Sequence, residues 1–232
     1  MEIESKFDFR SDIKKGQDPD KYSMALRAYH KQLWSKPLPN GKMFNLSSTE
    51  PGKYLLHKSE LGEFSLSSDS ISHSYIYTKR MSHIIENLSE ERKVAILNPL
   101  YTIGGFILFP SNKIEKKATI NGARGLSARI SDRFDLTLEC IRRYYLGIAS
   151  PLTEVFTRYG DFFALFENFK GYVEFFLLQD LVSDDFSEVK FLHLFDVSWP
   201  TRPLPKTIDE YERYISNTIE FVVSRGIRMS MA

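Results

Sequence analysis

Residues 42–77 read KMFNLSSTEPGKYLLHKSELGEFSLSSDSISHSYIY, and this stretch decides the fold class. Short apolar runs rich in aromatic and branched side chains alternate here with turn residues, which is typical of β-strands joined by tight connections. The expected strands are MFNL, KYLLH, EFSLS and SYIYT, separated by Pro51-Gly52, Gly62 and the SSDS turn. The pattern therefore predicts an antiparallel meander.

Outside the meander, apolar residues recur at spacings of three and four, as expected for helices with one buried face. Helices are expected over about residues 20–34, 82–97, 127–146, 151–166 and 172–182, with strands over 102–110 and 189–195 and a loop at TINGARG, residues 119–125. A capping box formed by Thr207 and Glu210 predicts the start of a last helix. The sequence thus predicts an α+β fold, with an antiparallel sheet from the N-terminal half packed with a mostly helical C-terminal half.

The chain has 232 residues, of which 42% are hydrophobic and 26% charged, so it can form a substantial core. It contains no fixed-period repeat, no low-complexity tract and no convincing linker. We therefore expect residues 1–232 to form a single domain.

Charge and cysteine content exclude several classes of protein. The formal net charge of +1 gives no whole-molecule attraction to nucleic acid or to an anionic membrane. The single cysteine, Cys140, excludes an intramolecular disulfide and fits a reducing compartment.

No apolar run approaches the roughly 20 residues of a membrane-spanning helix, and the first residues do not resemble a secretory signal. We expect a cytoplasmic protein that does not bind membranes.

Familiar catalytic motifs are missing from the sequence. It has neither a P-loop nor a dinucleotide-binding glycine pattern, and its five histidines are scattered without ligand spacing. We therefore expect no metal site, and no cofactor can be named.

The segment from Thr119 to Tyr145 has the most distinctive polar pattern. Residues 113–143 contain eight basic and four acidic side chains, a net charge of +4, whereas residues 150–196 contain three basic and nine acidic ones, a net charge of −6. One hypothesis is a protein that handles phosphate, nucleotides or nucleic acid in a pocket of arginines and carboxylates. It places an anion site at the 121–125 loop and the start of the following helix, because arginines bind phosphate well.

The candidate residues of this hypothesis have three roles. An anion would be bound by Asn121, Arg124, Arg129 and Arg133. Asp132 or Glu139 would act as a general base or bind magnesium. The ligand-binding residues would also include His30, Trp34 and Lys36 if the first helix packs against this loop.

Two alternatives to the anion site remain open at this point. The arginines could instead pair with the acids of the helix and of the C-terminal half and hold the fold together. The second alternative is a non-enzymatic interaction protein that contacts a protein partner or a second copy of itself, with a phage-defence or toxin–antitoxin pair as one setting.

Seven segments resemble an uncharacterised family of bacterial and phage-associated proteins classed as a domain of unknown function. The segments are FDFRSD (7–12), YHKQLWSKPLP (29–39), SELGEFSLSSD (59–69), YTIGGFILFP (101–110), TINGARG (119–125), DRFDLTLECIRRYY (132–145) and GYVEFFLLQDLV (171–182). The resemblance covers nearly the whole chain and implies one domain and a bacterial or mobile-element setting. It implies no activity, substrate or catalytic residue.

Overall fold

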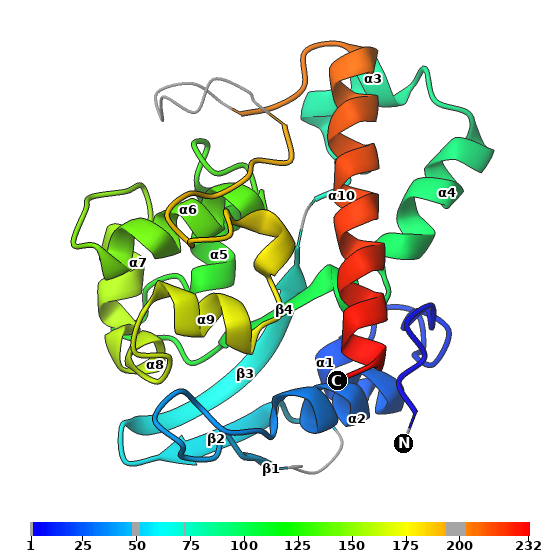
Figure 1. Ribbon diagram of the computed structural model, residues 1–232. Coiled ribbons are helices and arrows are strands. Elements are labelled where there is room, and N and C mark those ends of the chain that lie inside the picture. The colour runs from blue at the N-terminus through cyan, green and yellow to red at the C-terminus, as the bar shows by residue number, and fades with distance from the viewer. Residues whose placement is uncertain (1, 48–51, 72, 194–202) are drawn as a thin grey trace.

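The computed structural model describes residues 2–47, 52–71, 73–193 and 203–232 (Figure 1). Four antiparallel strands form a sheet of order β1-β2-β3-β4. They are β1 (Leu46–Ser47), β2 (Leu55–Ser59), β3 (Gly62–Ser70) and β4 (Phe106–Pro110). The α+β class is therefore confirmed, with the sheet in the N-terminal half and most helices in the C-terminal half.

The prediction of a last meander strand at SYIYT is wrong. Residues 74–78 form no strand, and the neighbour of β3 is β4, paired from Leu66↔Pro110 to Ser70↔Phe106. Tyr75 has φ 62°, a left-handed conformation that ends an extended strand. The hydroxyl groups of Tyr211 and Tyr214 also donate to the carbonyls of Ser74 (2.8 Å) and His73 (3.2 Å), so tertiary contacts replace a sheet ladder.

The helical elements of the first half are shorter than predicted. They are α1 (Pro19–Tyr22), α2 (Met24–Trp34), η1 (Lys79–Met81), α3 (Ser82–Ile85), α4 (Glu90–Leu100) and η2 (Ile103–Gly105). The predicted helix over 20–34 divides at Ser23, whose hydroxyl accepts the N–H of Leu26 at 3.0 Å and caps α2. Ser89 caps α4 in the same way.

The remaining helices are α5 (Ile120–Leu126), α6 (Phe134–Tyr145), α7 (Thr153–Arg158), α8 (Gly160–Ala164), α9 (Phe169–Phe175), η3 (Gln179–Leu181) and α10 (Ile208–Ser230). Helices α5 to α9 group on one side of β3 and β4, and α10 lies with α3 and α4 on the other (Figure 1). Val189 and Val182 form an isolated bridge; the end of the strand expected there lies outside the described residues.

The predicted loop at TINGARG is in fact helix α5, and α6 begins later than expected. Thr119 caps α5 by accepting the N–H of Gly122 at 3.3 Å. Ser131 and Asp132 have φ values of 49° and 61°, so the chain leaves the helical conformation just before α6. The expected helix over 127–146 is therefore limited to its second half.

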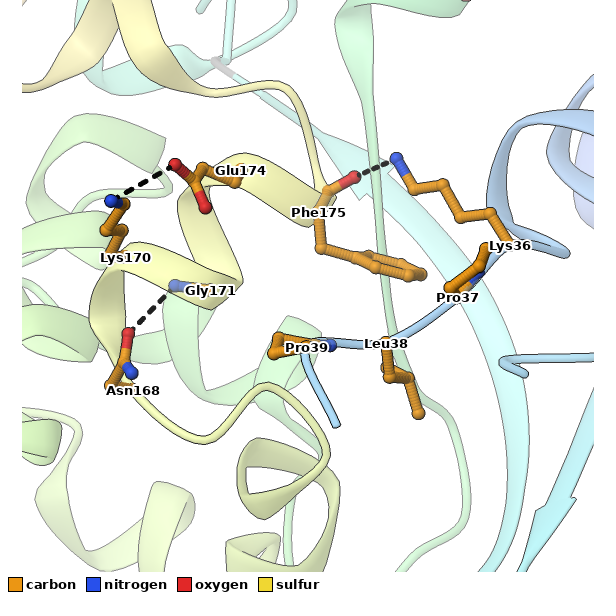
Figure 2. A pocket seen from close by; sticks show the side chains of 9 residues that line it. All are labelled: Lys36, Pro37, Leu38, Pro39, Asn168, Lys170, Gly171, Glu174 and Phe175. Atoms are coloured by element: carbon orange, nitrogen blue, oxygen red, sulfur yellow. Dashed lines mark hydrogen bonds and ion pairs between the residues drawn. The ribbon is translucent and has the colours of Figure 1, made fainter. Parts of the chain in front are cut away.

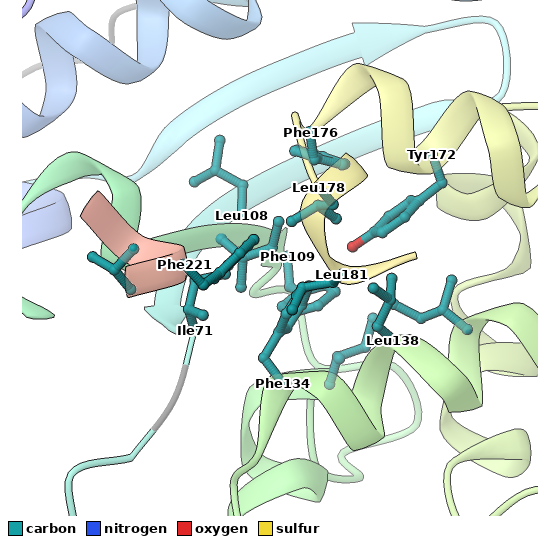
Figure 3. Packing of buried hydrophobic residues seen from close by; sticks show 14 of the residues in the cluster. Ile71, Leu108, Phe109, Phe134, Leu138, Tyr172, Phe176, Leu178, Leu181 and Phe221 are labelled. Carbon is teal, nitrogen blue, oxygen red and sulfur yellow. The ribbon is translucent and has the colours of Figure 1, made fainter. Parts of the chain in front are cut away.

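Buried apolar side chains from both halves of the chain form one cluster. Phe109 of β4, Phe134 and Leu138 of α6 and Phe221 of α10 meet there (Figure 3). Among the described residues, no helix combines the length and the apolar character needed to cross a membrane.

Helix α10 packs against η2 through a very close backbone contact. A Cβ atom on Gly104 would lie 2.0 Å from the carbonyl oxygen of Val222 and 2.8 Å from the amide nitrogen of Gly226. Arg225 of α10 donates to the carbonyls of Gly104 (2.8 Å) and Phe106 (2.7 Å). Only glycine at position 104 allows this contact, because no side chain could move the α10 backbone aside cheaply.

We predict that Gly104→Ala lowers the free energy of unfolding by about 3 kcal/mol, because the added methyl group overlaps the backbone of α10. Gly122→Ala is the matched control, since its Cβ would meet only ordinary contacts at 3.5 Å or more within α5. Alanine favours a helix, so this variant should be unchanged or up to about 1 kcal/mol more stable. Urea unfolding checks both values; equal stabilities would contradict the packing described.

Candidate functional site

The end of β3 carries polar side chains on both faces of the sheet. Successive residues of a strand point to opposite faces. Ser68 contacts His30 of α2 and Asp20 of α1, whereas Ser67 and Asp69 face α5 on the other side. Two polar networks therefore meet at this strand.

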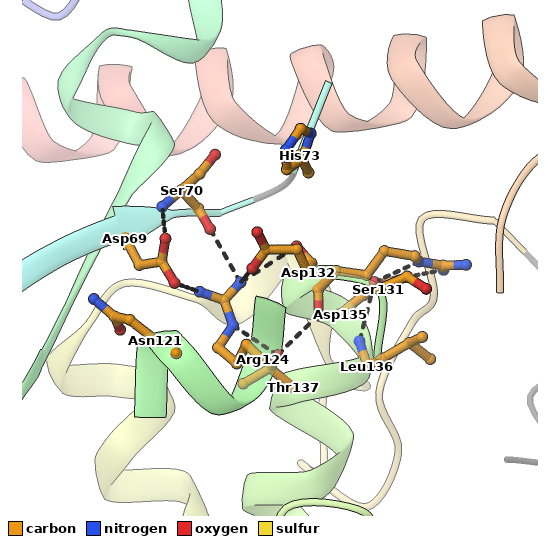
Figure 4. A network of polar contacts seen from close by, with 12 residues as sticks. Asp69, Ser70, His73, Asn121, Arg124, Ser131, Asp132, Asp135, Leu136 and Thr137 are labelled. Carbon is orange, nitrogen blue, oxygen red and sulfur yellow. Dashed lines mark hydrogen bonds and ion pairs between the residues drawn. The ribbon is translucent and has the colours of Figure 1, made fainter. Parts of the chain in front are cut away.

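Arg124 is the centre of the network on the α5 side (Figure 4). Its side chain has no exposed surface. Nε donates to Oγ1 of Thr137 at 2.9 Å, Nη1 contacts the carboxylate of Asp69, and Nη2 donates to the carbonyl of Ser70 at 3.0 Å. Nη2 also lies 3.5 Å from the carbonyl oxygen and 3.9 Å from Oδ1 of Asp132. Arg124 therefore links β3, α5 and the start of α6.

Arg133 is equally buried and makes a second structural junction. It forms an ion pair with Asp135 and donates to the carbonyls of His193 (3.0 Å) and Pro203 (3.3 Å). Asp135 also accepts the N–H of Leu192 at 2.9 Å. These bonds hold residues 192, 193 and 203 against the start of α6.

The other predicted residues of this segment are dispersed. Glu139 is 6% exposed and pairs with Arg142 and Arg143 of its own helix, each at 2.7 Å. Asn121 donates to Oγ of Ser67 (3.3 Å) and to the carbonyl of Ser68 (3.2 Å). Arg129 is exposed on the loop between α5 and α6 and has no partner among the described residues.

We predict a structural role for Arg124. Arg124→Met leaves the half-buried Asp69 carboxylate without its cation, so the free energy of unfolding should fall by about 3 kcal/mol or more. The exposed Arg129→Met is the control and should change stability by less than about 0.5 kcal/mol. Chemical denaturation measures both. A stable Arg124→Met protein would show that Arg124 is free to serve a ligand instead.

His30 and Trp34 belong to the network on the other face of β3. Nε1 of Trp34 donates to Nδ1 of His30 at 3.0 Å, so neutral His30 carries its proton on Nε2, which lies 2.7 Å from Oγ of Ser68. Ser68 in turn donates to the carboxylate of Asp20, both from Oγ and from its N–H. Burial lowers the pKa of His30 to about 3, so this histidine stays neutral.

We predict that Asp20 makes stability depend on pH. Burial and, to a smaller extent, the charges of Asp18 and Asp69 raise the pKa of Asp20 to about 7, although the hydrogen bonds from Ser68 lower it. Between about pH 4 and 7 the folded chain then holds a proton that the unfolded chain releases, so this contribution to stability decreases as the pH rises.

Urea unfolding of the wild type and of Asp20→Asn from pH 4.5 to 8 checks this prediction. The stability of the wild type relative to the variant should decrease across that range. A difference that does not change with pH would mean that the carboxyl group has an ordinary pKa.

Lys36 lies at a separate cavity of about 370 Å³ between its own loop and α9 (Figure 2). Its Nζ donates to the carbonyl of Phe175 at 2.6 Å and lies 5.1 Å from the ring of Trp34. Burial, together with the nearby charge of Arg225, lowers the pKa of Lys36 to about 8. The structure therefore does not bring Lys36 to the Arg124 network.

A second cavity, of about 320 Å³, borders the Arg124 network; we call it the His73 cleft. It is lined by His73, Tyr75, Thr78, Lys79, Arg80, Gly125, Ser131, Asp132 and Leu204. Asp132 is the one predicted site residue in this lining. A neighbouring cavity of about 240 Å³ shares His73 and Thr78 with it.

Three of the eight described non-glycine residues with positive φ line the His73 cleft. Tyr75, Ser131 and Asp132 all line it and all have positive φ, at 62°, 49° and 61°. The hydroxyl of Tyr75 donates to the carbonyl of Ser131 at 2.6 Å and joins the two strained segments. Such conformations are unfavourable for residues other than glycine and cluster at functional sites.

The cleft presents hydrogen-bond donors of defined orientation. Nδ1 of His73 accepts the N–H of Tyr75 at 2.8 Å, which leaves the proton of the neutral ring on Nε2. Burial lowers the pKa of His73 and outweighs the opposing effect of Asp132, so the neutral form is favoured. Figure 4 shows His73 close to the Arg124 and Asp132 contact.

Lys79 and Arg80 add positive charge to the cleft. Both side chains are exposed on η1, and neither has a partner among the described residues. Oδ1 of Asp132 is buried and accepts no hydrogen bond from any described residue, although Arg124 lies 3.9 Å away. The cleft therefore carries two exposed cations that pair with no described residue, together with the ring of His73.

Sequence reasoning missed His73, Lys79 and Arg80. His73 directly precedes the strand expected at SYIYT, and Lys79 and Arg80 lie between that strand and the helix expected from residue 82. Only the polar residues among 72–80 could have indicated a site. No group of three metal-ligating side chains is found within residues 2–47, 52–71, 73–193 and 203–232.

Comparison with known proteins identifies a family but no activity. Residues 3–229 match a family model described as "Family of unknown function (DUF6994)". No curated protein and no solved structure matches the chain.

Proposed function

Because the chain belongs to the DUF6994 family, whose description names no activity, we propose from the geometry that it binds a small anion, best a phosphate group, in the His73 cleft. The observation that supports this most is the pair of exposed cations, Lys79 and Arg80, which have no partner among the described residues and line the same cleft as His73 with its Nε2 donor. Charge-assisted bonds from such groups are the usual means of binding phosphate.

The fixed shape of the cleft supports the same proposal. Two segments of its wall are held by hydrogen bonds, because Tyr75 donates to the carbonyl of Ser131 at 2.6 Å and Arg124 donates to the carbonyl of Asp132 at 3.5 Å. A preorganised site loses less free energy on binding than a mobile one. The anion site therefore differs from the one expected from sequence: Arg124 and Arg133 serve as support, and the ligand contacts come from His73 and η1.

A catalytic role for any residue of the cleft stays a prediction. Asp132 is the candidate general base that lines the cleft, whereas Glu139 is held by Arg142 and Arg143. The alternative of an interaction protein, a cytoplasmic location and a bacterial or phage-associated setting also stay predictions.

Lys79→Ala/Arg80→Ala should weaken the binding of inorganic phosphate by about tenfold or more, because two charge-assisted contacts are lost. Lys14→Ala/Lys15→Ala is the matched control, since it removes the same charge from another exposed pair. Isothermal titration calorimetry at constant ionic strength measures both. Equal weakening in the two double variants would indicate only a general charge effect, and no binding by the wild type would overturn the proposal.

A further inference from the structure

Building on the proposed function, we infer that the ligand of the His73 cleft is a nucleoside monophosphate. Its phosphate lies at Lys79 and Arg80, and its base lies against the ring of Tyr77 in the neighbouring cavity. Tyr77 then forms an aromatic subsite beside the phosphate site.

Two adjoining cavities leave room for a ligand larger than phosphate. His73 and Thr78 line both of them. The His73 cleft has a volume of about 320 Å³ and its neighbour a volume of about 240 Å³. Together they lie well within the range of small-molecule sites, roughly 300–1,000 Å³. A phosphate group alone would leave the second cavity without a ligand.

The second cavity, which we call the Tyr77 pocket, differs from the cleft in the chemistry of its lining. Most of its nine lining residues are aromatic or aliphatic, namely Tyr77, Leu97, Leu100, Tyr101 and Phe106. In the lining of the cleft, Tyr75 and Leu204 are the residues of this kind, and Lys79 and Arg80 supply positive charge. The anionic end of a ligand therefore belongs in the cleft and its apolar end in the Tyr77 pocket.

Tyr77 offers an accessible aromatic ring to that apolar end. The residue is 78% exposed, and it makes no hydrogen bond and no ring contact with any described residue. The fold therefore makes little use of this side chain. A nucleobase can stack on such a ring whatever its identity, because every base has a π-face.

The aromatic and cationic groups are close enough for one ligand to reach both. Tyr77 precedes Lys79 by two residues, which places their Cα atoms within about 8 Å of each other. Thr78 lies between them and lines both cavities. A nucleoside monophosphate carries its phosphate and its base at two ends of one ribose, so it can span this short separation.

The boundary between the two cavities is held by the fold. The ring of His73 stacks on Tyr75, with the ring centroids 5.0 Å apart and the planes 14° from parallel. The hydroxyl groups of Tyr211 and Tyr214 donate to the carbonyls of Ser74 and His73. The wall shared by the phosphate site and the Tyr77 pocket is therefore ordered before a ligand binds, which lowers the cost of binding.

A planar base fits Tyr77 better than an alkyl chain does. An alkyl group gains free energy only from the apolar area that it buries, and against an exposed ring much of it would stay in water. Aromatic rings that stack gain free energy beyond the area that they bury. The exposure of Tyr77 therefore favours a nucleotide over an alkyl phosphate.

Calorimetry on the whole chain tests the inference with ribose 5-phosphate, uridine monophosphate, adenosine monophosphate and hexyl phosphate. Adenosine monophosphate should bind about tenfold more tightly than ribose 5-phosphate, because it adds a base that stacks on Tyr77. Uridine monophosphate should fall between these two, since its ring is smaller. Hexyl phosphate should bind more weakly than adenosine monophosphate.

Tyr77→Ala should reduce the preference for adenosine monophosphate over ribose 5-phosphate to about twofold or less, whereas Tyr77→Phe, which keeps the ring, should retain most of it. Tyr22→Ala is the matched control, since Tyr22 is also exposed, at 43%, and lines neither cavity. An exposed position tolerates substitution, so Tyr77→Ala should fold, and its thermal unfolding without ligand verifies this.

The possible failures are distinct. If none of the four compounds binds to the wild type, the proposed anion site is wrong and the inference falls with it. If ribose 5-phosphate and adenosine monophosphate bind equally, the anion site stands and the recognition of a base is overturned. Hexyl phosphate binding as tightly as adenosine monophosphate would replace the base with an apolar chain. A preference that survives in Tyr77→Ala would overturn the role of Tyr77.

Discussion

A guanidinium group that loses all contact with water must find protein acceptors for its five N–H donors. Arg124, Arg133 and Arg225 are all fully buried, and each directs most of these donors to segments that are distant in sequence. Arg124 bonds to the end of β3 and to α6, Arg133 holds residues 193 and 203 at α6, and Arg225 bonds to Phe176 and to η2. The helical half is therefore fixed to the sheet by directional bonds as well as by apolar packing.

This constraint also explains where the cleft lies. Arg124 contacts Asp69 and Asp132, so the strand end and the turn before α6 must stay together. The next wall is the segment from His73 to Thr78, which the hydroxyls of Tyr211 and Tyr214 hold at its start. Bonds that lie mostly outside the cleft thus hold its walls, whereas Lys79 and Arg80 are exposed and pair with no residue in the described part of the chain.

The alternating pattern of residues 55–70 predicted β2 and β3, since that signal is local. It could not predict that residues 74–78 leave the sheet, because the bond from Tyr211 to Ser74 spans 137 residues. The helical pattern over 127–146 likewise concealed the left-handed turn at Ser131 and Asp132. For the site, sequence reasoning named Asp132 but missed His73 and η1, which only the tertiary fold brings beside it.

The three cleft residues with positive φ, Tyr75, Ser131 and Asp132, differ in how the fold uses their side chains. Glycine would adopt positive φ without cost, so each side chain needs a reason to be there. Tyr75 bonds to the carbonyl of Ser131, and the hydroxyl of Ser131 donates to the carbonyl of Ala128 at 3.1 Å. The carboxylate of Asp132 has only its long ion pair to Arg124 within the described part of the chain. Aspartate is one of the residues other than glycine that best tolerate positive φ. Asp132 therefore suits the left-handed turn before α6, and its carboxylate stays beside the buried guanidinium of Arg124.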